Sequence, residues 1–525
     1  MKHSDFKHNL KSTASVLLLA VCIFTCACSD GASDTTDGAS DTTGGADSMT
    51  EENAVTSPSD VTDNGETTPV EDTDTLTEDA ETVGSVEDDT TSPGDKSDND
   101  STAADITSSS DITTPSDTTD EITTDAVTTA PQVVPTEKTS VPVILGKVSQ
   151  AYDRVIIYGS TENNAKITYA GKNGEKFTDR ARGHNFYIEV NGTKDDVITL
   201  YATADGKNDS NKVQVSVSFG GDQTNVFAGR NSHLFYRPTV SYLLGSVKAN
   251  EAALKYTRNV LSNVLKEVQA QTGKDTKLIY LIAPNPVTIY HNEQHDYLLD
   301  ITGGKRFSTP GSEFVAYMNG AGKHEDIIVP DLLKVFDGHK NEMIYFSTDT
   351  HWSELGAYYA YAEMMKYINK DFPGAKAHPL SDFNIEMINC AGGDLSSMLG
   401  AHNMKEETPF LIAKFKETGD IYPIKRSDSI GYRIAGINWG LYPRDSYINN
   451  PSLPTAYALS DSYGAYFFPF ASMGFSHLRL HGANNNTPID IGTIAECKPD
   501  YIIFTYTDRN IDSNLGMITH LWSNI

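Results

Sequence analysis

The chain has 525 residues, of which 38% are hydrophobic and 21% charged, and its formal net charge is −30 at pH 7. This length and apolar content suffice for at least one large hydrophobic core. Between residues 30 and 135 there are 28 acidic residues and one basic residue, so this stretch carries 27 of the 30 net negative charges. The rest of the chain is close to neutral and shows no basic patch, which argues against a nucleic-acid partner.

The N-terminus has the features of an export signal. Lys2, Lys7 and Lys11 precede an apolar run over residues 16–24 that is too short for a permanent membrane helix. The run ends at Thr25-Cys26-Ala27-Cys28, which resembles a bacterial lipoprotein cleavage site with Cys28 as the lipidated residue. We therefore expect residues 1–28 to be a signal peptide, and the chain to reach the bacterial cell surface, attached to the plasma membrane by lipid only. An ordinary secretory signal cut nearby is the alternative.

Residues 29–140 are rich in Asp, Thr, Ser and Glu and almost free of aromatic residues. Low hydrophobicity combined with high like charge predicts a disordered, extended linker. Three of the five cysteines lie in the signal region, which leaves Cys390 and Cys497 in the folded part. Their spacing carries no signature, so either two separate thiols or one disulfide bridge is compatible with the sequence.

Residues 141–220 contain short apolar or alternating runs separated by Gly, Asn and Asp, typical of strands in an all-β sandwich. The predicted strands are 155–158, 165–169, 186–190, 197–202 and 213–217. The region resembles the immunoglobulin-like modules of bacterial surface proteins. A spacer and a glycan-binding module are both compatible with it.

Residues 222–525 show a different pattern, in which apolar runs alternate with helical periodicity. Asn250 is placed to cap a helix that reaches Gln271 and stops at Gly273. Further helices are predicted over 354–368 and 489–497, and the predicted strands are 278–283, 327–329, 343–346, 456–459, 478–480 and 501–504. Continuous apolar strands between helices predict an α/β domain whose parallel sheet is covered on both faces.

Polar residues follow several of these strands, and ligands of such sheets bind at the carboxyl ends of the strands. The residues in this position are Asn285, Asp349, His351, Ser462 and Arg509. Because the strands are expected to run parallel, we expect these residues to meet at one edge and form a single site.

Three of these residue types can perform nucleophilic catalysis together. A serine hydroxyl needs a base within hydrogen-bond reach, and the base needs a group that orients it. Ser462 can be the nucleophile, His351 the base and Asp349 the orienting acid, since triads occur in several chain orders. The backbone N–H groups after Ser462 and the Asn285 side chain are candidate oxyanion donors. Each piece alone has a simpler interpretation, such as a surface turn or a helix cap.

Several short motifs resemble the SGNH hydrolase-like family of the alginate O-acetyltransferases (AlgX and AlgJ type) and the related DHHW proteins. The most specific is Thr348-Asp349-Thr350-His351-Trp352-Ser353. The others are the opening box at 226–236, a proline-rich loop at 283–290, Gly393-Asp394-Leu395 and Ser460-Asp461-Ser462-Tyr463. The sequence departs from the family where Ser460 replaces a glycine and where Ser232-His233 replaces Gly-Trp.

This resemblance implies an SGNH-type fold over residues 222–525 and a triad of Ser462, His351 and Asp349. It also implies transfer of acetyl groups to, or removal from, hydroxyls of a polysaccharide or cell-wall glycan, with Tyr463, Trp352 and Arg509 as further substrate-binding candidates. Trp352 can equally belong to the core. By analogy with the family, a membrane partner would supply the acyl group. No cofactor and no metal are expected.

Two other functions compete with the esterase or transferase. The chain could be an inactive SGNH-like surface protein that only binds glycan. It could also be a metal-dependent hydrolase using Asp349, His351 and an acid such as Asp394 or Asp461, although no cluster at metal-ligand spacing supports this.

Overall fold

The computed structural model describes residues 135–518 except 151–153, 171–173, 175, 193–195, 222–223, 415–423, 427–428, 432–443, 483–489 and 517. The expected signal peptide, Cys28 and most of the acidic linker lie outside the described residues. None of the described helices combines the length and apolar character that crossing a membrane requires.

Two antiparallel sheets make up the first described region. One has the order β1-β2-β5 and the other β4-β3-β6-β7. Their strands are β1 Val143–Ser149, β2 Arg154–Ser160, β3 Lys166–Ala170, β4 Lys176–Arg180, β5 Asn185–Asn191, β6 Val197–Thr203 and β7 Val213–Ser216. All five strands expected from the sequence are present, and β1 and β4 are additional. Alternate residues of both sheets, including Ile157, Ile188 and Leu200, share one buried cluster. The relation to immunoglobulin-like modules stays a prediction.

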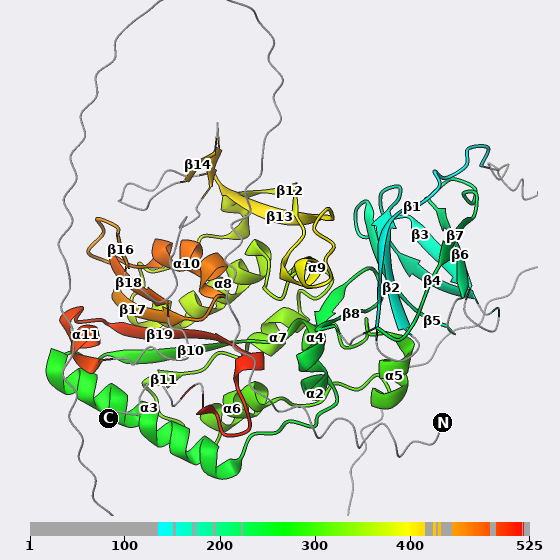
Figure 1. Ribbon diagram of the computed structural model, residues 1–525. Helices are drawn as coiled ribbons and strands as arrows, with labels where there is room; N and C mark the ends of the chain where they lie inside the picture. Colours follow the sequence, from blue (N-terminus) through cyan, green and yellow to red (C-terminus); the bar gives the residue numbers. More distant parts are fainter. Residues whose placement is uncertain are drawn as a thin grey trace, which may run out of the picture. The chain divides into compact units, whose positions relative to one another are not determined.

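The α/β region is built on a six-stranded sheet with the order β11-β10-β19-β17-β18-β16 (Figure 1). The strands are β10 Lys277–Ala283, β11 Ile327–Ile328, β16 Arg444–Tyr447, β17 Thr455–Ser460, β18 His477–Gly482 and β19 Tyr501–Thr507. The first five strands in this order run parallel, as expected, whereas β16 at the edge pairs antiparallel with β18.

Helices cover both faces of this sheet. Along β10, residues 278, 280 and 282 face the cluster that contains α3, α6 and α11, while residues 279, 281 and 283 face α4, α7, α8 and α10. This alternation explains why β10 reads as an uninterrupted apolar run. The helices are α2 Val240–Leu243, α3 Glu251–Thr272, α4 Pro286–Ile289, α5 Asp296–Thr302, α6 Pro310–Asn319, α7 Leu332–Asp337, α8 Glu354–Asp371, α9 Asp394–Met398, α10 Gly464–Ala471 and α11 Ile491–Glu496.

Helix ends follow the local sequence. The Asn250 side chain accepts from the Ala252 N–H at the start of α3, and Gly273 ends the helix with a φ of 65°. The Ser353 side chain accepts from the Gly356 N–H and so caps α8, the helix that follows the Asp-x-His motif directly.

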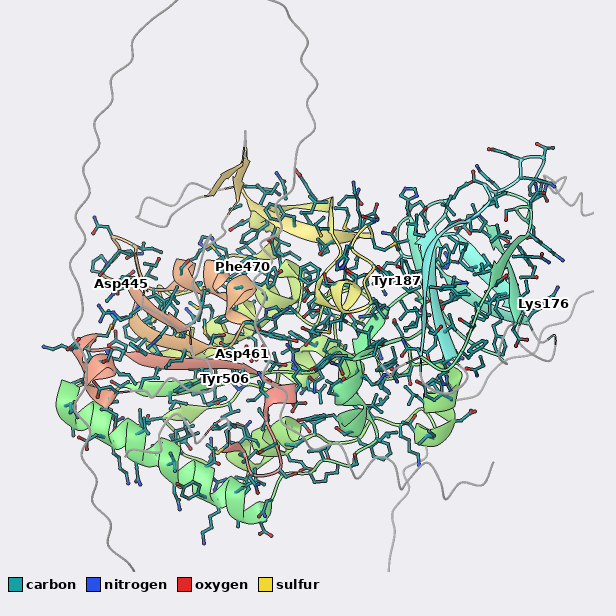
Figure 2. All side chains as sticks on the ribbon, viewed as in Figure 1. Lys176, Tyr187, Asp445, Asp461, Phe470 and Tyr506 are labelled. Carbon is teal, nitrogen blue, oxygen red and sulfur yellow. The ribbon has the colours of Figure 1, made fainter. Side chains whose placement is uncertain are left out.

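The remaining strands form two-stranded ribbons. They are β8 Val226–Ala228 with β9 Leu234–Tyr236, β12 Phe383–Ala391 with β13 Lys405–Ala413, and β14 Ile424–Arg426 with β15 Ser429–Gly431. Ile156 and Tyr187 of the β region share a buried cluster with Val226, Leu234 and Leu395. Figure 2 labels Tyr187, and it also marks Asp461 and Tyr506 in the α/β region.

One expected strand is wrong. Residues 343–346 make no strand of the sheet, and Tyr345 forms only an isolated bridge with Trp352. The segment folds back on itself instead, because the Phe346 N–H donates to the His351 carbonyl and the Ser353 N–H donates to the Ile344 carbonyl. Its apolar side chains are nevertheless buried, which is why the run resembles a strand in the sequence.

The two cysteines of the folded part are free thiols, so the disulfide alternative is not realised.

Candidate active site

The turn between β17 and α10 presents Ser462. Asp461 closes this turn, since its carboxylate accepts from the Tyr463 N–H at 3.0 Å and from the Thr507 N–H at 2.8 Å. The Asn510 side chain donates to the same carboxylate at 3.1 Å. The turn that carries Ser462 is therefore tied to the end of the neighbouring strand β19. Burial raises the pKa of Asp461.

Ser460, which stands where the family has a glycine, fits this turn without strain. It has no positive φ, and its fully buried hydroxyl donates to the Asp461 carbonyl at 2.9 Å. The substitution therefore leaves Ser462 at the tip of the turn.

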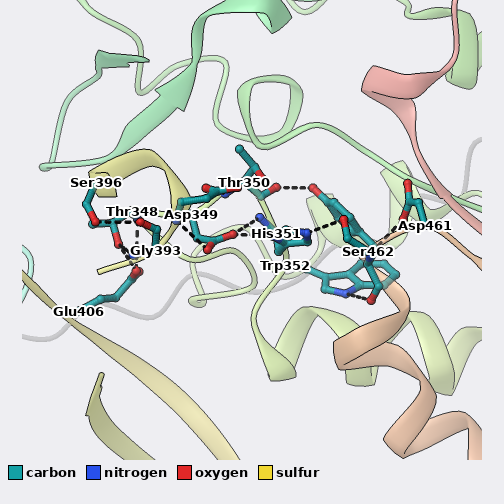
Figure 3. A network of polar contacts seen from close by, with 12 residues as sticks. Thr348, Asp349, Thr350, His351, Trp352, Gly393, Ser396, Glu406, Asp461 and Ser462 are labelled. Atoms are coloured by element: carbon teal, nitrogen blue, oxygen red, sulfur yellow. Dashed lines mark hydrogen bonds and ion pairs between the residues drawn. The ribbon is translucent and has the colours of Figure 1, made fainter. Parts of the chain in front are cut away.

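Asp349, His351 and Ser462 form one hydrogen-bonded chain (Figure 3). His351 Nδ1 lies 2.6 Å from Asp349 Oδ1, and His351 Nε2 lies 2.7 Å from Ser462 Oγ. With Nδ1 donating to the carboxylate, Nε2 is left to accept the proton of the serine hydroxyl. The His351 and Asp349 side chains are 18% and 17% exposed, so the pair is sheltered yet reachable from solvent.

The local fold holds the acid in place from two sides. Asp349 Oδ1 also accepts from the His351 N–H at 2.9 Å, and Oδ2 accepts from the Asp394 N–H at 3.0 Å. Burial alone would raise the pKa of Asp349, but the charge and hydrogen bonds of His351 lower it below its ordinary value. For His351, burial acts to lower the pKa, and the Asp349 carboxylate outweighs it and raises the pKa. The pair thus favours a charged imidazole, as a catalytic base requires after it takes a proton.

Two acidic residues, Asp394 and Glu406, form hydrogen bonds with the loop at 347–351. Neither of them was assigned to the Asp349–His351–Ser462 triad from the sequence. The Asp394 carboxylate accepts from the Thr350 N–H at 2.8 Å and from its hydroxyl at 2.5 Å. Glu406 of β13 is 3% exposed and accepts from the backbone and hydroxyl of Thr348 (Figure 3). It also accepts from the backbone and hydroxyl of Ser347. The Gly393-Asp394-Leu395 motif pointed to the first acid, whereas nothing in the sequence distinguishes Glu406.

The same residues contain one group that could bind a metal ion. Ligand atoms of Asp349, His351 and Asp394 all lie within 4.8 Å of one another. The His351 nitrogen nearest the acids is already bonded to Asp349, and both Asp394 oxygens accept from Thr350. A metal would have to displace these hydrogen bonds, so the residues fit a hydrogen-bonded triad better than a metal centre.

The other candidate residues are buried to different degrees. Asn285 follows β10 and is fully buried, and among the residues that the structure describes neither its amide nitrogen nor its side-chain oxygen has a hydrogen-bond partner. Trp352 is also fully buried and donates to the Tyr463 carbonyl at 3.0 Å, which leaves its ring no surface for a substrate. Tyr463 is equally buried and its hydroxyl donates to the Thr350 carbonyl. Arg509 is half-buried and bonds to Thr350 and Tyr463.

The opening box places two unusual residues near this site. Ser232 adopts a φ of 55°, a left-handed conformation that favours glycine, the residue found in the family. His233, which replaces the family tryptophan, is fully buried and stacks on Phe235 at 4.4 Å between ring centroids. The box continues into β9, whose residues line a very small cavity of about 10 Å³, roughly the room of one water molecule. Its lining is Leu234, Phe235, Tyr236, Thr239, Pro286, Val287, Thr350, Leu395 and Arg509.

Comparison with known proteins agrees with the motifs. Residues 226–418 match the family model described as the SGNH hydrolase-like domain of acetyltransferase AlgX. The family resemblance expected from the sequence is thereby confirmed, and this part of the chain has the SGNH-like α/β fold. The match includes Asp349 and His351 and ends before Ser462. A search of curated proteins found no match.

Solved structures show more distant likeness. A DHHW family protein from Eubacterium siraeum is 15% identical, with 62% of this chain and 95% of the other covered and a TM-score of 0.38. PatB1 from Bacillus cereus is 14% identical, covering 55% of this chain and 98% of its own, at a TM-score of 0.40. The O-acetyltransferase domain of Pseudomonas putida AlgJ is 14% identical, and the match covers 58% of this chain and 100% of that domain, at a TM-score of 0.34. These likenesses are too weak to assign an activity.

Proposed function

We propose that this chain is a serine esterase or O-acetyltransferase that acts on the hydroxyls of a polysaccharide or cell-wall glycan through Ser462, His351 and Asp349. The observation that carries the proposal is the unbroken chain of hydrogen bonds from Asp349 to Ser462 Oγ. The match of residues 226–418 to an acetyltransferase family model supports the acyl chemistry.

The geometry suits an acyl-serine mechanism. Ser462 Oγ attacks the ester carbonyl carbon while His351 Nε2 takes the hydroxyl proton, and the Asp349 carboxylate stabilises the resulting imidazolium. The imidazolium then returns the proton to the leaving oxygen, and the acyl group stays on Ser462. In the second half, water or a sugar hydroxyl gives its proton to His351 and attacks the acyl carbon; the bond to Ser462 Oγ then breaks, and His351 returns the proton to Ser462 Oγ.

The negative oxygen of the tetrahedral intermediate requires hydrogen-bond donors. One candidate set is the backbone N–H groups that follow Ser462, but those of Tyr463, Gly464 and Ala465 already donate to the Asp461 carboxylate, the Asp461 carbonyl and the Ser462 carbonyl, so an oxyanion would have to compete with these bonds. The Asn285 amide is a second candidate, because it has no partner within the described part of the chain and follows β10, which is separated from β17 only by β19. An unpaired buried amide costs about 1–3 kcal/mol, so a ligand oxygen that accepts from it would recover this energy.

Whether water or a sugar hydroxyl takes the acyl group depends on the acceptor side of the site. Transfer outside the cytosol needs a donor that reaches the cell surface, and we propose a membrane partner that delivers acyl groups. We further propose that the signal peptide at 1–28 exports the chain, that lipid on Cys28 anchors it, and that residues 29–140 hold residues 141–525 away from the membrane.

A serine-reactive fluorophosphonate tests the nucleophile. We expect wild-type protein and a Ser452→Ala control to be labelled, since Ser452 is an exposed loop residue that bonds only to Asn450. Ser462→Ala should not be labelled and should lose acetyl-ester turnover. Oligosaccharide acceptors added to the same assay separate transferase from esterase by the appearance of acetylated sugar.

Other outcomes point to the competing functions. Turnover that survives Ser462→Ala and disappears with a chelator would identify the Asp349, His351 and Asp394 group as a metal centre. Glycan retention by an unlabelled wild-type protein would identify a binding protein without catalytic activity.

A further inference from the structure

Arg509 contacts both loops that carry the proposed catalytic residues. It lies directly after β19, in the short turn Asp508–Asn510. Its Nη1 donates to the Thr350 carbonyl at 3.1 Å and to the Tyr463 hydroxyl at 3.0 Å, and its Nη2 donates to the Thr350 hydroxyl at 3.2 Å. Thr350 stands between Asp349 and His351, and Tyr463 directly follows Ser462. One guanidinium therefore links the acid–base loop to the nucleophile turn.

Thr350 has no free polar atom in this arrangement. Its N–H and hydroxyl donate to the Asp394 carboxylate, its hydroxyl oxygen accepts from Arg509, and its carbonyl accepts from Arg509 and from Tyr463. Such a fully bonded residue can hardly shift without breaking several hydrogen bonds at once. The planar, rigid fork of an arginine suits this bridging better than the point charge of a lysine.

The surroundings of Arg509 argue against binding of an anionic substrate group. Burial acts to lower the pKa of Arg509, and Tyr463, Asp461 and Asp394 outweigh it and raise the pKa. The guanidinium is therefore already balanced by acids of the protein. An incoming carboxylate or phosphate would meet these acids and Asp349 as well, and like charges at this range repel.

We propose that Arg509 is a positioning residue, which sets the distance between Ser462 Oγ and His351 Nε2 by holding Thr350 and Tyr463 together. This inference rests on the proposed function, because it assigns Arg509 a task in the same reaction. It replaces the substrate-binding role expected for Arg509 from the sequence.

Arg509→Gln and Arg509→Lys test the proposal in the full chain with p-nitrophenyl acetate as substrate. A misplacement of about 1 Å costs on the order of 100-fold in rate, so we expect kcat to fall by about 100-fold in Arg509→Gln. KM should change by less than about threefold, because this small ester needs no anion site. Arg509→Lys should remain at least about tenfold impaired, since it keeps the charge but loses the fork.

The pH profile gives a readout that loss of packing would not produce. The charge of Arg509 lowers the pKa of His351. Loss of this charge in Arg509→Gln should raise the pKa of His351, so the acid limb of the kcat–pH profile should move to higher pH. In Arg509→Lys the charge is kept, and the limb should stay in place. Tyr463→Phe provides a second variant that keeps the buried ring and loses only the hydroxyl link, and it should reduce kcat without changing KM.

Arg258→Gln is the matched control. Arg258 also donates to backbone carbonyl oxygens, those of Tyr317, Ala321 and Gly322, but it lies on α3 and has no contact with the triad. It should keep wild-type kcat. Unchanged kcat in Arg509→Gln would overturn the proposal, and full activity of Arg509→Lys would show that charge alone matters.

A crystal structure of Arg509→Gln separates this inference from the proposed function. We expect the distance from Ser462 Oγ to His351 Nε2 to lengthen from 2.7 Å. An unchanged distance would refute the positioning role even if the protein turned out to have no esterase activity. Absence of Ser462-dependent turnover in the wild type, together with a lengthened distance in the variant, would instead refute only the proposed function.

Discussion

Gly393 is the residue at which a single methyl group should damage the site most directly. A Cβ added at Gly393 would lie 2.7 Å from Asp349 Cγ, and closer still to its Cβ and Oδ2, whereas ordinary contact begins at 3.4 Å. The φ of Gly393 is −78°, so alanine is not excluded by backbone conformation and the effect is purely steric.

The size of the effect follows from these distances. Asp349 Cγ must move by at least about 0.7 Å to reach ordinary contact, and displacements of this order cost up to about 100-fold in rate when they misplace a catalytic group. The same shift strains the hydrogen bond from the Asp394 N–H to Asp349 Oδ2. Overpacking of this kind also costs about 1–3 kcal/mol of folding stability.

The assay compares kcat for an acetyl ester with the melting temperature of Gly393→Ala. Gly516→Ala is the matched control, because the nearest atoms to its added Cβ lie at 3.8 Å. We expect Gly393→Ala to lose 10- to about 100-fold in kcat while it remains folded at 25 °C, and Gly516→Ala to resemble the wild type. Wild-type activity of Gly393→Ala would refute the assignment of Asp349 as the orienting acid.

Three further changes test the site and its supports. Asp349→Asn should lower kcat by on the order of 10⁴-fold. It should also move the acid limb of the pH–rate profile to lower pH, because the carboxylate that raises the pKa of His351 is gone, and an unmoved limb would contradict this. Glu406→Gln should cost about 1–3 kcal/mol in a urea titration, since an amide group then faces donors of Ser347 and Thr348; unaltered stability would show that these bonds contribute little. Burial raises the pKa of Asp508 from 3.8 to about 6. Between about pH 4 and 6 the folded state therefore keeps a proton on Asp508 that the unfolded state has lost, and the free energy of unfolding should fall as pH rises through this range, by on the order of 3 kcal/mol. Asp508→Asn should flatten that part of the stability curve, and an equally steep curve in the variant would exclude Asp508 as its source.

Local chemistry in the sequence was enough to identify the central strands, the helices α3, α8 and α11 and the three central side chains, whereas the short helices and the two-stranded ribbons were not expected. The caps of α3 and α8 are short-range signals, because a side chain and the N–H groups it accepts from are at most three residues apart. The strands β10, β17 and β19 are continuous apolar runs because both of their faces are buried. Asp349, His351 and Ser462 stood out because each lies within a short motif whose residue types match one chemistry.

The same local reasoning misread residues 343–346. An apolar run of four residues is compatible with a strand or with an irregular buried segment, and periodicity cannot separate the two. Tertiary hydrogen bonds decide the matter here, since residues 344 and 346 pair with the chain at 353 and 351 instead of with a neighbouring strand.

The sequence alone indicated which residues carry the proposed chemistry and where the central strands and the helices α3, α8 and α11 lie, because these depend on side-chain type and on neighbours a few residues away. Only the tertiary structure decided what holds those residues together. Glu406, Asp394 and Arg509 reach the loop at 347–351 across separations of 44 to 159 residues in the chain. Contacts at such separations arise when strand order and loop paths bring distant segments side by side, and no local pattern records that geometry.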